Sequence, residues 1–158
     1  MNGLAISSDL VDSMRDFART AYPEECCGFL LSPDTSTGGE ETRTIVAVVP
    51  ARNRSEAERQ RRFVILPDEL RAAERDAAAH SRLVSGFYHS HPDHPARPSV
   101  FDQEHAWPWY AYLILASTRN STPSSIGAFE LDPDLREFRA IDLTVVPAPI
   151  PSGGSPAP

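Results

Sequence analysis

Residues 86–102, GFYHSHPDHPARPSVFD, join a run typical of a buried strand to a turn rich in proline and histidine. Along a strand, successive side chains point to opposite faces, so His89 and His91 project to the same side. Ser99 and Asp102 lie three residues apart and suit the start of a helix. Because the prolines stiffen the turn, this helix is expected to bring Asp102 back toward the end of the strand. The stretch therefore predicts a strand, a turn and a short helix arranged around two histidines.

These side chains have the composition of a metal site. Two imidazoles on one face can hold one metal ion, and a carboxylate can supply a third ligand. Such a set leaves the fourth position of a tetrahedral zinc ion open for water, as in catalytic rather than structural zinc sites. The metal would lower the pKa of that water to about 7, and a base would still be needed to take its proton. The competing interpretations are a satisfied polar cluster for the histidines and a capping role for Asp102.

The rest of the chain alternates helical and strand-like segments. Helices are predicted from apolar spacing, capping residues and a proline at a first helical position over 8–21, 67–80 and 99–107. Strands are predicted from short apolar runs over 26–31, 42–50, 62–66, 82–90, 110–117, 125–131 and 137–146. The last two strands are expected to form a hairpin across Asp132-Pro133-Asp134.

Length, charge and cysteine usage exclude several classes of protein. The 158 residues suit one domain, and the segment 147–158 is rich in proline, glycine and serine and is expected to be disordered. A formal net charge of -7 argues against a nucleic-acid surface. No apolar run approaches the roughly 18 residues of a membrane span, and the adjacent Cys26 and Cys27 cannot build a disulfide framework. We therefore expect a soluble, cytoplasmic protein.

One local cluster of positive charge departs from this acidic balance. Five arginines fall within eleven residues: Arg52, Arg54, Arg59, Arg61 and Arg62. They could form a solvated loop or a contact surface for an acidic or carboxylate-bearing partner.

The spacing of the histidine stretch resembles that of a known family. His89-Ser90-His91-Pro92 followed by Ser99 and Asp102 reproduces the pattern HxHPx₆Sx₂D, and PEECCG at 23–28 matches the upstream glutamate element of JAMM (MPN-plus) zinc metalloproteases. The resemblance runs from the first helix to the terminal strands. It implies an α+β domain over residues 1–146 with a curved mixed β-sheet flanked by helices, which is the JAB/MPN fold, similar to that of cytidine deaminases.

The resemblance also implies a role for each position of the motif. It assigns a zinc ion to three ligands: His89, His91 and Asp102. Glu25 would be the general base, and Ser99 would donate a hydrogen bond to the oxyanion of the tetrahedral intermediate. Glu24 is the rival base, but adjacent strand residues face opposite sides, and the family spacing favours Glu25. His94 receives no ligand role, and His105 is expected to orient the aspartate or to pack.

JAMM enzymes hydrolyse the amide bond after the C-terminal Gly-Gly of ubiquitin or ubiquitin-like proteins. The small single-domain form is similar to the bacterial branch associated with sulfur-carrier proteins, which implies a peptidase that acts on such a carrier or its adduct. The arginines of 52–62 are then expected to help to seat the carrier. The alternatives are an isopeptidase that removes a ubiquitin-like modifier from lysine conjugates in a bacterial tagging or antiphage system, and a metal-free binding module. The presence of all ligand positions speaks against the binding module.

Overall fold

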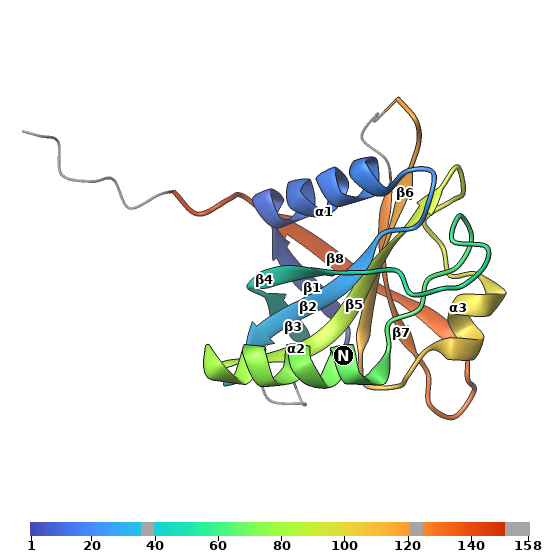
Figure 1. Cartoon of the computed structure of the whole chain (residues 1–158). Helices are drawn as coiled ribbons and strands as arrows, with labels where there is room; N and C mark the ends of the chain where they lie inside the picture. The colour runs from blue at the N-terminus through green and yellow to red at the C-terminus, as the bar shows by residue number, and fades with distance from the viewer. Residues whose placement is uncertain (36–39, 121–124, 151–158) are drawn as a thin grey trace, which may run out of the picture.

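The chain forms a curved sheet with helices packed on it (Figure 1). The computed structural model describes residues 1–35, 40–120 and 125–150. Within them the elements follow in the order β1 Gly3–Ser7, α1 Ser8–Ala21, β2 Cys27–Pro33, β3 Thr42–Ile45, β4 Ala47–Ala51, α2 Pro67–Ala79, β5 Arg82–Pro92, α3 Val100–His105, β6 Ala111–Ser117, β7 Ile126–Leu131 and β8 Phe138–Val146. The strand order across the sheet is β3-β1-β8-β7-β6-β5-β2-β4.

The sheet is mixed and nearly closes on itself. β1 runs parallel to β3 and β8, and β5 runs parallel to β6, whereas the remaining neighbours pair antiparallel. β3 and β4 stand at opposite ends of the strand order, yet only Val46 separates them in the sequence. The N–H of Val46 donates to the carbonyl of Leu31 in β2, so one residue bridges the two edges. The predicted α+β class with a curved mixed sheet is confirmed.

Side chains that alternate along the strands fill apolar cores on both faces of the sheet. On β5, Tyr88 belongs to the core beneath α1, and the neighbouring Phe87 belongs to the core beneath α2. The apolar stripe of α1 buries Met14 completely, and burial of such a side chain contributes roughly 1.5–3 kcal/mol. His89 and His91 follow Phe87 at steps of two, so strand periodicity places both histidines on the face covered by α2 and α3.

The observed strands differ from the predicted ones over 42–50 and near the N-terminus. The predicted strand over 42–50 is two strands, because the chain changes partners at Val46 and pairs first with β1 and then with β2. β1 is not evident from the sequence pattern. Its five residues gain their strand partners from β3 and β8, which lie far away in the sequence.

The predicted strand over 62–66 is wrong. The N–H of Arg54 donates to the carbonyl of Val64, and the N–H of Val64 donates to Oδ1 of Asn53. Nδ2 of Asn53 donates to the carbonyl of Arg62. Because the peptide groups of this segment form hydrogen bonds with the preceding loop, the segment adds no strand to the sheet.

The other predicted elements are present. α1, α2, β5 and β6 lie where expected, the β7–β8 hairpin forms, and α3 ends at His105, two residues earlier than predicted. Residues 147–150 follow β8 without regular structure, and the rest of the predicted disordered tail, 151–158, lies outside the described residues. None of the described helices is long and apolar enough to cross a membrane. Cys26 and Cys27 are free and buried.

Candidate metal centre

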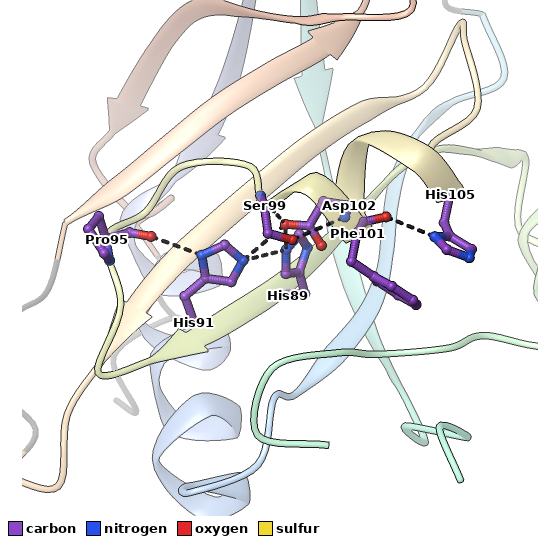
Figure 2. A network of polar contacts seen from close by, with 7 residues as sticks. All are labelled: His89, His91, Pro95, Ser99, Phe101, Asp102 and His105. Carbon is purple, nitrogen blue, oxygen red and sulfur yellow. Dashed lines mark hydrogen bonds and ion pairs between the residues drawn. The ribbon is translucent and has the colours of Figure 1, made fainter. Parts of the chain in front are cut away.

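Four ionisable side chains converge at the end of β5: Glu25, His89, His91 and Asp102. Each is buried, and one ligand atom of each lies within 4.8 Å of the others. The Nε2 atoms of His89 and His91 are 3.1 Å apart, and Oδ2 of Asp102 lies 3.2 Å and 3.1 Å from them (Figure 2). The histidines project from one face of β5, and the carboxylate comes from the first turn of α3. The predicted strand, turn and helix therefore do bring these groups together.

The helix cap holds the carboxylate of Asp102 in place. The N–H of Ser99 donates to Oδ2 of Asp102 at 2.8 Å, and the N–H of Asp102 donates to Oγ of Ser99 at 3.1 Å. This reciprocal pair is a capping box that begins α3. Asp102 therefore caps α3 and also lies beside the histidines, because one carboxylate oxygen can accept from several donors.

A backbone carbonyl orients the ring of His91. Its Nδ1 lies 2.9 Å from the carbonyl oxygen of Pro95 (Figure 2). Because a carbonyl can only accept, Nδ1 carries a proton, and in the neutral ring the lone pair remains on Nε2. The proline turn that returns α3 to the strand therefore also sets the tautomer that a metal ligand needs.

Glu25, and not Glu24, enters the cluster. Glu25 is 2% exposed, whereas Glu24 is an exposed residue. The N–H of Glu25 donates to the carbonyl of Arg59 at 2.7 Å, and its carbonyl accepts from Nδ2 of Asn53 at 3.2 Å. The loop between β4 and α2 thus fixes the backbone of Glu25 just before β2 begins.

Burial and neighbouring charges shift the pKa of three groups in the cluster. Burial raises the pKa of Glu25 to about 8, against the attraction of His91. Burial alone would raise the pKa of Asp102, but attraction to His89 and hydrogen bonds from both histidines hold it well below its usual range. Burial lowers the pKa of His91, yet hydrogen bonds to Asp102 and to the Pro95 carbonyl outweigh this and raise it. At neutral pH the metal-free cluster therefore pairs a protonated Glu25 with an ionised Asp102.

The cluster fits a divalent cation. Among the described residues, Oε1 of Glu25, Oδ1 of Asp102 and Nδ1 of His89 are buried without a hydrogen-bond partner. Buried polar atoms left in this way cost free energy, and a bound ion or water is a common partner for them. Two imidazole nitrogens and a carboxylate are a donor set that suits zinc and leaves a position open. These residues could therefore hold a zinc ion.

Aromatic rings pack beside the cluster. Phe63 stacks on His89 with ring centroids 4.5 Å apart, and it lies in the segment wrongly predicted as a strand. His105 stacks on Phe101 at 3.9 Å, and its Nδ1 donates to the Phe101 carbonyl (Figure 2). Of its two predicted roles His105 therefore packs and does not orient the carboxylate. His94 is exposed and stays outside the cluster.

An apolar pocket of about 220 Å³ opens next to the cluster. Among the described residues, its lining includes His89 and Asp102 from the cluster but neither Glu25 nor His91. Most of the remaining wall is aromatic or aliphatic and includes Phe63, Ile65, Phe87, Phe101, Trp107 and Tyr112. A pocket of this character accepts an apolar side chain.

The arginines of 52–62 are all exposed, so the loop presents positive charge to the solvent. Arg54 and Arg62 form ion pairs with neighbouring glutamates at 2.8 Å and 3.1 Å. The guanidinium of Arg62 also lies 4.8 Å from the ring centre of Phe101, which lines the pocket. Arg62 therefore brings positive charge to the rim of the pocket.

Comparison with known proteins identifies the family of this protein. Residues 7–129 match the family described as prokaryotic homologs of the JAB domain, and the chain belongs to this family. It is 32% identical to the desampylase of Haloferax volcanii over 90% of this chain and 96% of that protein. It is also 32% identical to the CysO-cysteine peptidase of Mycobacterium tuberculosis, over 93% of this chain and 89% of that protein.

A solved structure supports the fold. A JAB1/MPN domain protein from Archaeoglobus fulgidus superposes with a TM-score of 0.53 at 18% identity, covering 91% of this chain and 98% of that chain. The predictions of the family, of the JAB/MPN fold and of a hydrolase of the JAB type are confirmed by these comparisons.

Proposed function

We propose that the protein is a zinc-dependent peptidase that hydrolyses the amide bond after the C-terminal Gly-Gly of a ubiquitin-like protein of the sulfur-carrier type. The observation that carries this proposal is the buried convergence of two imidazoles and two carboxylates at the end of β5. Relatives named desampylase and CysO-cysteine peptidase support a ubiquitin-like substrate. In this proposal three residues hold the zinc ion: His89, His91 and Asp102.

Glu25 is the proposed general base. Zinc, when bound, would polarise the scissile carbonyl and lower the pKa of the attacking water. Glu25 takes a proton from that water and returns it to the departing nitrogen. Among the described residues its Oε1 has no hydrogen-bond partner, which leaves it available for this exchange. Burial disfavours a negative charge on Glu25 and so makes its carboxylate a stronger base.

Ser99 is the proposed oxyanion donor. Its Oγ accepts from the N–H of Asp102, which leaves its own proton to donate to the oxygen of the scissile carbonyl. Negative charge develops on that oxygen only as the tetrahedral intermediate forms, so the bond stabilises the transition state more than the substrate. Loss of one such donor costs about 10²–10³ in kcat in other enzymes.

The pocket supports one placement of the two halves of the substrate. Because Glu25 returns its proton to the leaving nitrogen, the leaving group lies on the Glu25 side of the cluster. The pocket borders His89 and Asp102 and not Glu25, so the acyl half, which is the end of the ubiquitin-like chain, lies along the pocket. Two glycines pass close to the metal ligands, and an apolar side chain that precedes them fills the pocket. Arg62 at the rim faces carboxylates of the carrier.

The relative named desampylase favours a second candidate, an isopeptidase that removes a ubiquitin-like modifier from lysine conjugates. This reaction would use the same base, ligands and acyl half of the substrate. The two candidates differ in the leaving amine, which is an α-amine in the first and a lysine side chain in the second.

The test is cleavage of defined carriers. The zinc-loaded protein is incubated with Gly-Gly-terminated ubiquitin-like proteins that bear a cysteine or peptide extension, or a lysine-linked isopeptide. Cleavage directly after the second glycine is expected, with loss on chelation and recovery on addition of zinc. Faster cleavage of the isopeptide would favour the second candidate. If neither substrate is cleaved at full zinc occupancy, the proposal fails.

A further inference from the structure

The backbone of Glu25 depends on a loop that is distant in the sequence. Glu25 precedes β2, and both of its peptide groups bond to residues between β4 and α2. Its N–H donates to the Arg59 carbonyl at 2.7 Å, and its carbonyl accepts from Nδ2 of Asn53 at 3.2 Å. The direction in which the Glu25 side chain leaves the backbone is therefore set by this loop.

The side-chain amide of Asn53 joins the two ends of the loop to Glu25. Besides the Glu25 carbonyl, Nδ2 donates to the carbonyl of Arg62 at 2.9 Å. Oδ1 accepts from the N–H of Ser55 at 3.0 Å and from the N–H of Val64 at 3.2 Å. An asparagine amide has two donor hydrogens and two acceptor lone pairs, so Asn53 uses all of them.

The same amide also places an aromatic ring against a histidine of the cluster. Arg62 and Val64, which both bond to the Asn53 side chain, flank Phe63. The ring of Phe63 stacks on His89 at 4.5 Å. The position of the Glu25 backbone and the stacking of Phe63 on His89 thus both depend on a single amide group.

We propose that Asn53 is a positioning residue for Glu25, and that it acts on the reaction through that carboxylate without touching the substrate. The inference rests on the proposed function of Glu25 as the base. Misplacement of a catalytic group by about 1 Å can cost about 100-fold in rate, so a loop that sets its backbone has a measurable effect on turnover. The loop between β4 and α2 then positions Glu25 as well as contributing to binding of the carrier protein.

The variant Asn53→Asp keeps the acceptor oxygen of the side chain and removes its donor N–H groups. Aspartate has the same shape and still accepts from Ser55 and Val64. It cannot donate to the carbonyls of Glu25 and Arg62, and its charge repels both oxygens. The matched control is Gln60→Ala, an exposed position in the same loop. Asn53→Ser, which is smaller and uncharged, replaces Asn53→Asp in every measurement if that variant does not fold.

The kinetic test uses the zinc-loaded protein and a cleavable carrier fusion. Asn53→Asp is expected to keep its zinc, to lower kcat by about 100-fold and to change KM little, whereas Gln60→Ala keeps wild-type kinetics. In a Glu25→Gln background the same change is expected to lower the residual rate no further, because Asn53 acts through Glu25. An equal loss in both backgrounds, or no loss of kcat, would overturn the inference.

A second readout does not need the substrate. Amide hydrogen exchange of residues 24–28 is compared with that of β5 and β6 in the wild type, Asn53→Asp and Gln60→Ala. Asn53→Asp is expected to accelerate exchange at residues 24–28 and not in β5 or β6, because the N–H of Glu25 bonds to the loop. Unchanged or uniformly faster exchange would contradict a local positioning role. If no carrier is cleaved by the wild type, the proposed function fails, while this measurement still decides the role of Asn53.

Discussion

Adjacent glutamates before β2 have opposite environments, and this predicts opposite effects on turnover. Glu25 is 2% exposed inside the cluster, and Glu24 is exposed. Glu25→Gln is expected to keep the zinc ion and lower kcat by about 10²–10⁴-fold, because the amide cannot take a proton from water. Glu24→Gln is the control and should retain wild-type activity. Metal analysis and carrier cleavage test both variants, and the reverse pattern would assign the base to Glu24.

The observed helix cap of Asp102 and its proposed role as a zinc ligand can be separated by one atom. Asp102→Asn preserves an oxygen that can accept from the N–H of Ser99, so the start of α3 is retained. It removes the negative charge that faces His89 and His91. We expect the variant to fold with its helix intact and to lose zinc affinity by at least about tenfold, with activity lost in parallel. Titration with zinc while binding is followed by calorimetry checks this, and wild-type affinity would exclude Asp102 as a ligand.

At the scale of elements, the region from β5 to α3 was predictable because its signals are local. Period-two alternation puts His89 and His91 on one face, and the spacing of Ser99 and Asp102 specifies a capping box. The segment 62–66 has the same apolar character as a strand. Its backbone partners, however, are set by a side-chain amide and the loop before it, which no local pattern reports.

Long-range pairing explains the other differences from the sequence pattern. β1 gains its partners from β3 and β8, and the break at Val46 reflects a change of neighbour within a continuous apolar run. For the site, the proposed ligand set follows from spacing and family resemblance. The stacking of Phe63 on His89 and the bonds of Asn53 do not, because they depend on the path of the loop.

The pocket beside α3 predicts a substrate contact that two nearby tryptophans can test. Trp107 lines the pocket, whereas Trp109 is 73% exposed and is not among the residues of its wall. Trp107→Ala is expected to lower kcat/KM for the carrier by about tenfold or more, because an apolar side chain of the substrate loses its contact surface. Trp109→Ala is the matched control, and zinc content should be unchanged in both. Equal effects of the two changes would contradict a role for the pocket in substrate binding.

The exposed arginines of 52–62 predict an electrostatic contribution to carrier binding. Arg62 lies over Phe101 at the rim of the pocket, whereas Arg71 lies on α2 and pairs with Asp68 at 2.7 Å. Arg62→Glu is expected to lower kcat/KM by about tenfold at low ionic strength, with a smaller effect at high salt. Arg71→Glu carries the same change of charge and should leave cleavage unchanged. If charge reversal at Arg62 had no effect at low salt, the loop would not seat the carrier.

At the scale of the whole molecule, two histidines and two carboxylates are buried between one face of the sheet and the segments that cover it. β5 and β6 support the histidines from beneath, and α3 and the 52–66 loop cover them. Burial of ionisable groups costs stability unless they are paired or bind an ion. In the metal-free protein the cluster adjusts by protonation, because burial raises the pKa of Glu25 to about 8 and hydrogen bonds raise that of His91.

The stability of the metal-free protein is therefore expected to fall as the pH rises from 6 to 8. In this range Glu25 is ionised in the unfolded chain, with an ordinary pKa of 4.5, but holds its proton in the folded chain. The folded state thus binds more protons, and the raised pKa of His91 acts in the same direction. Zinc binding should instead strengthen with pH, because its ligands bind deprotonated. Denaturant unfolding of chelated and zinc-loaded protein at both pH values measures this, and Glu25→Gln should weaken the trend in the chelated form. A chelated wild type that gains stability toward pH 8 would show that Glu25 is ionised in the folded state.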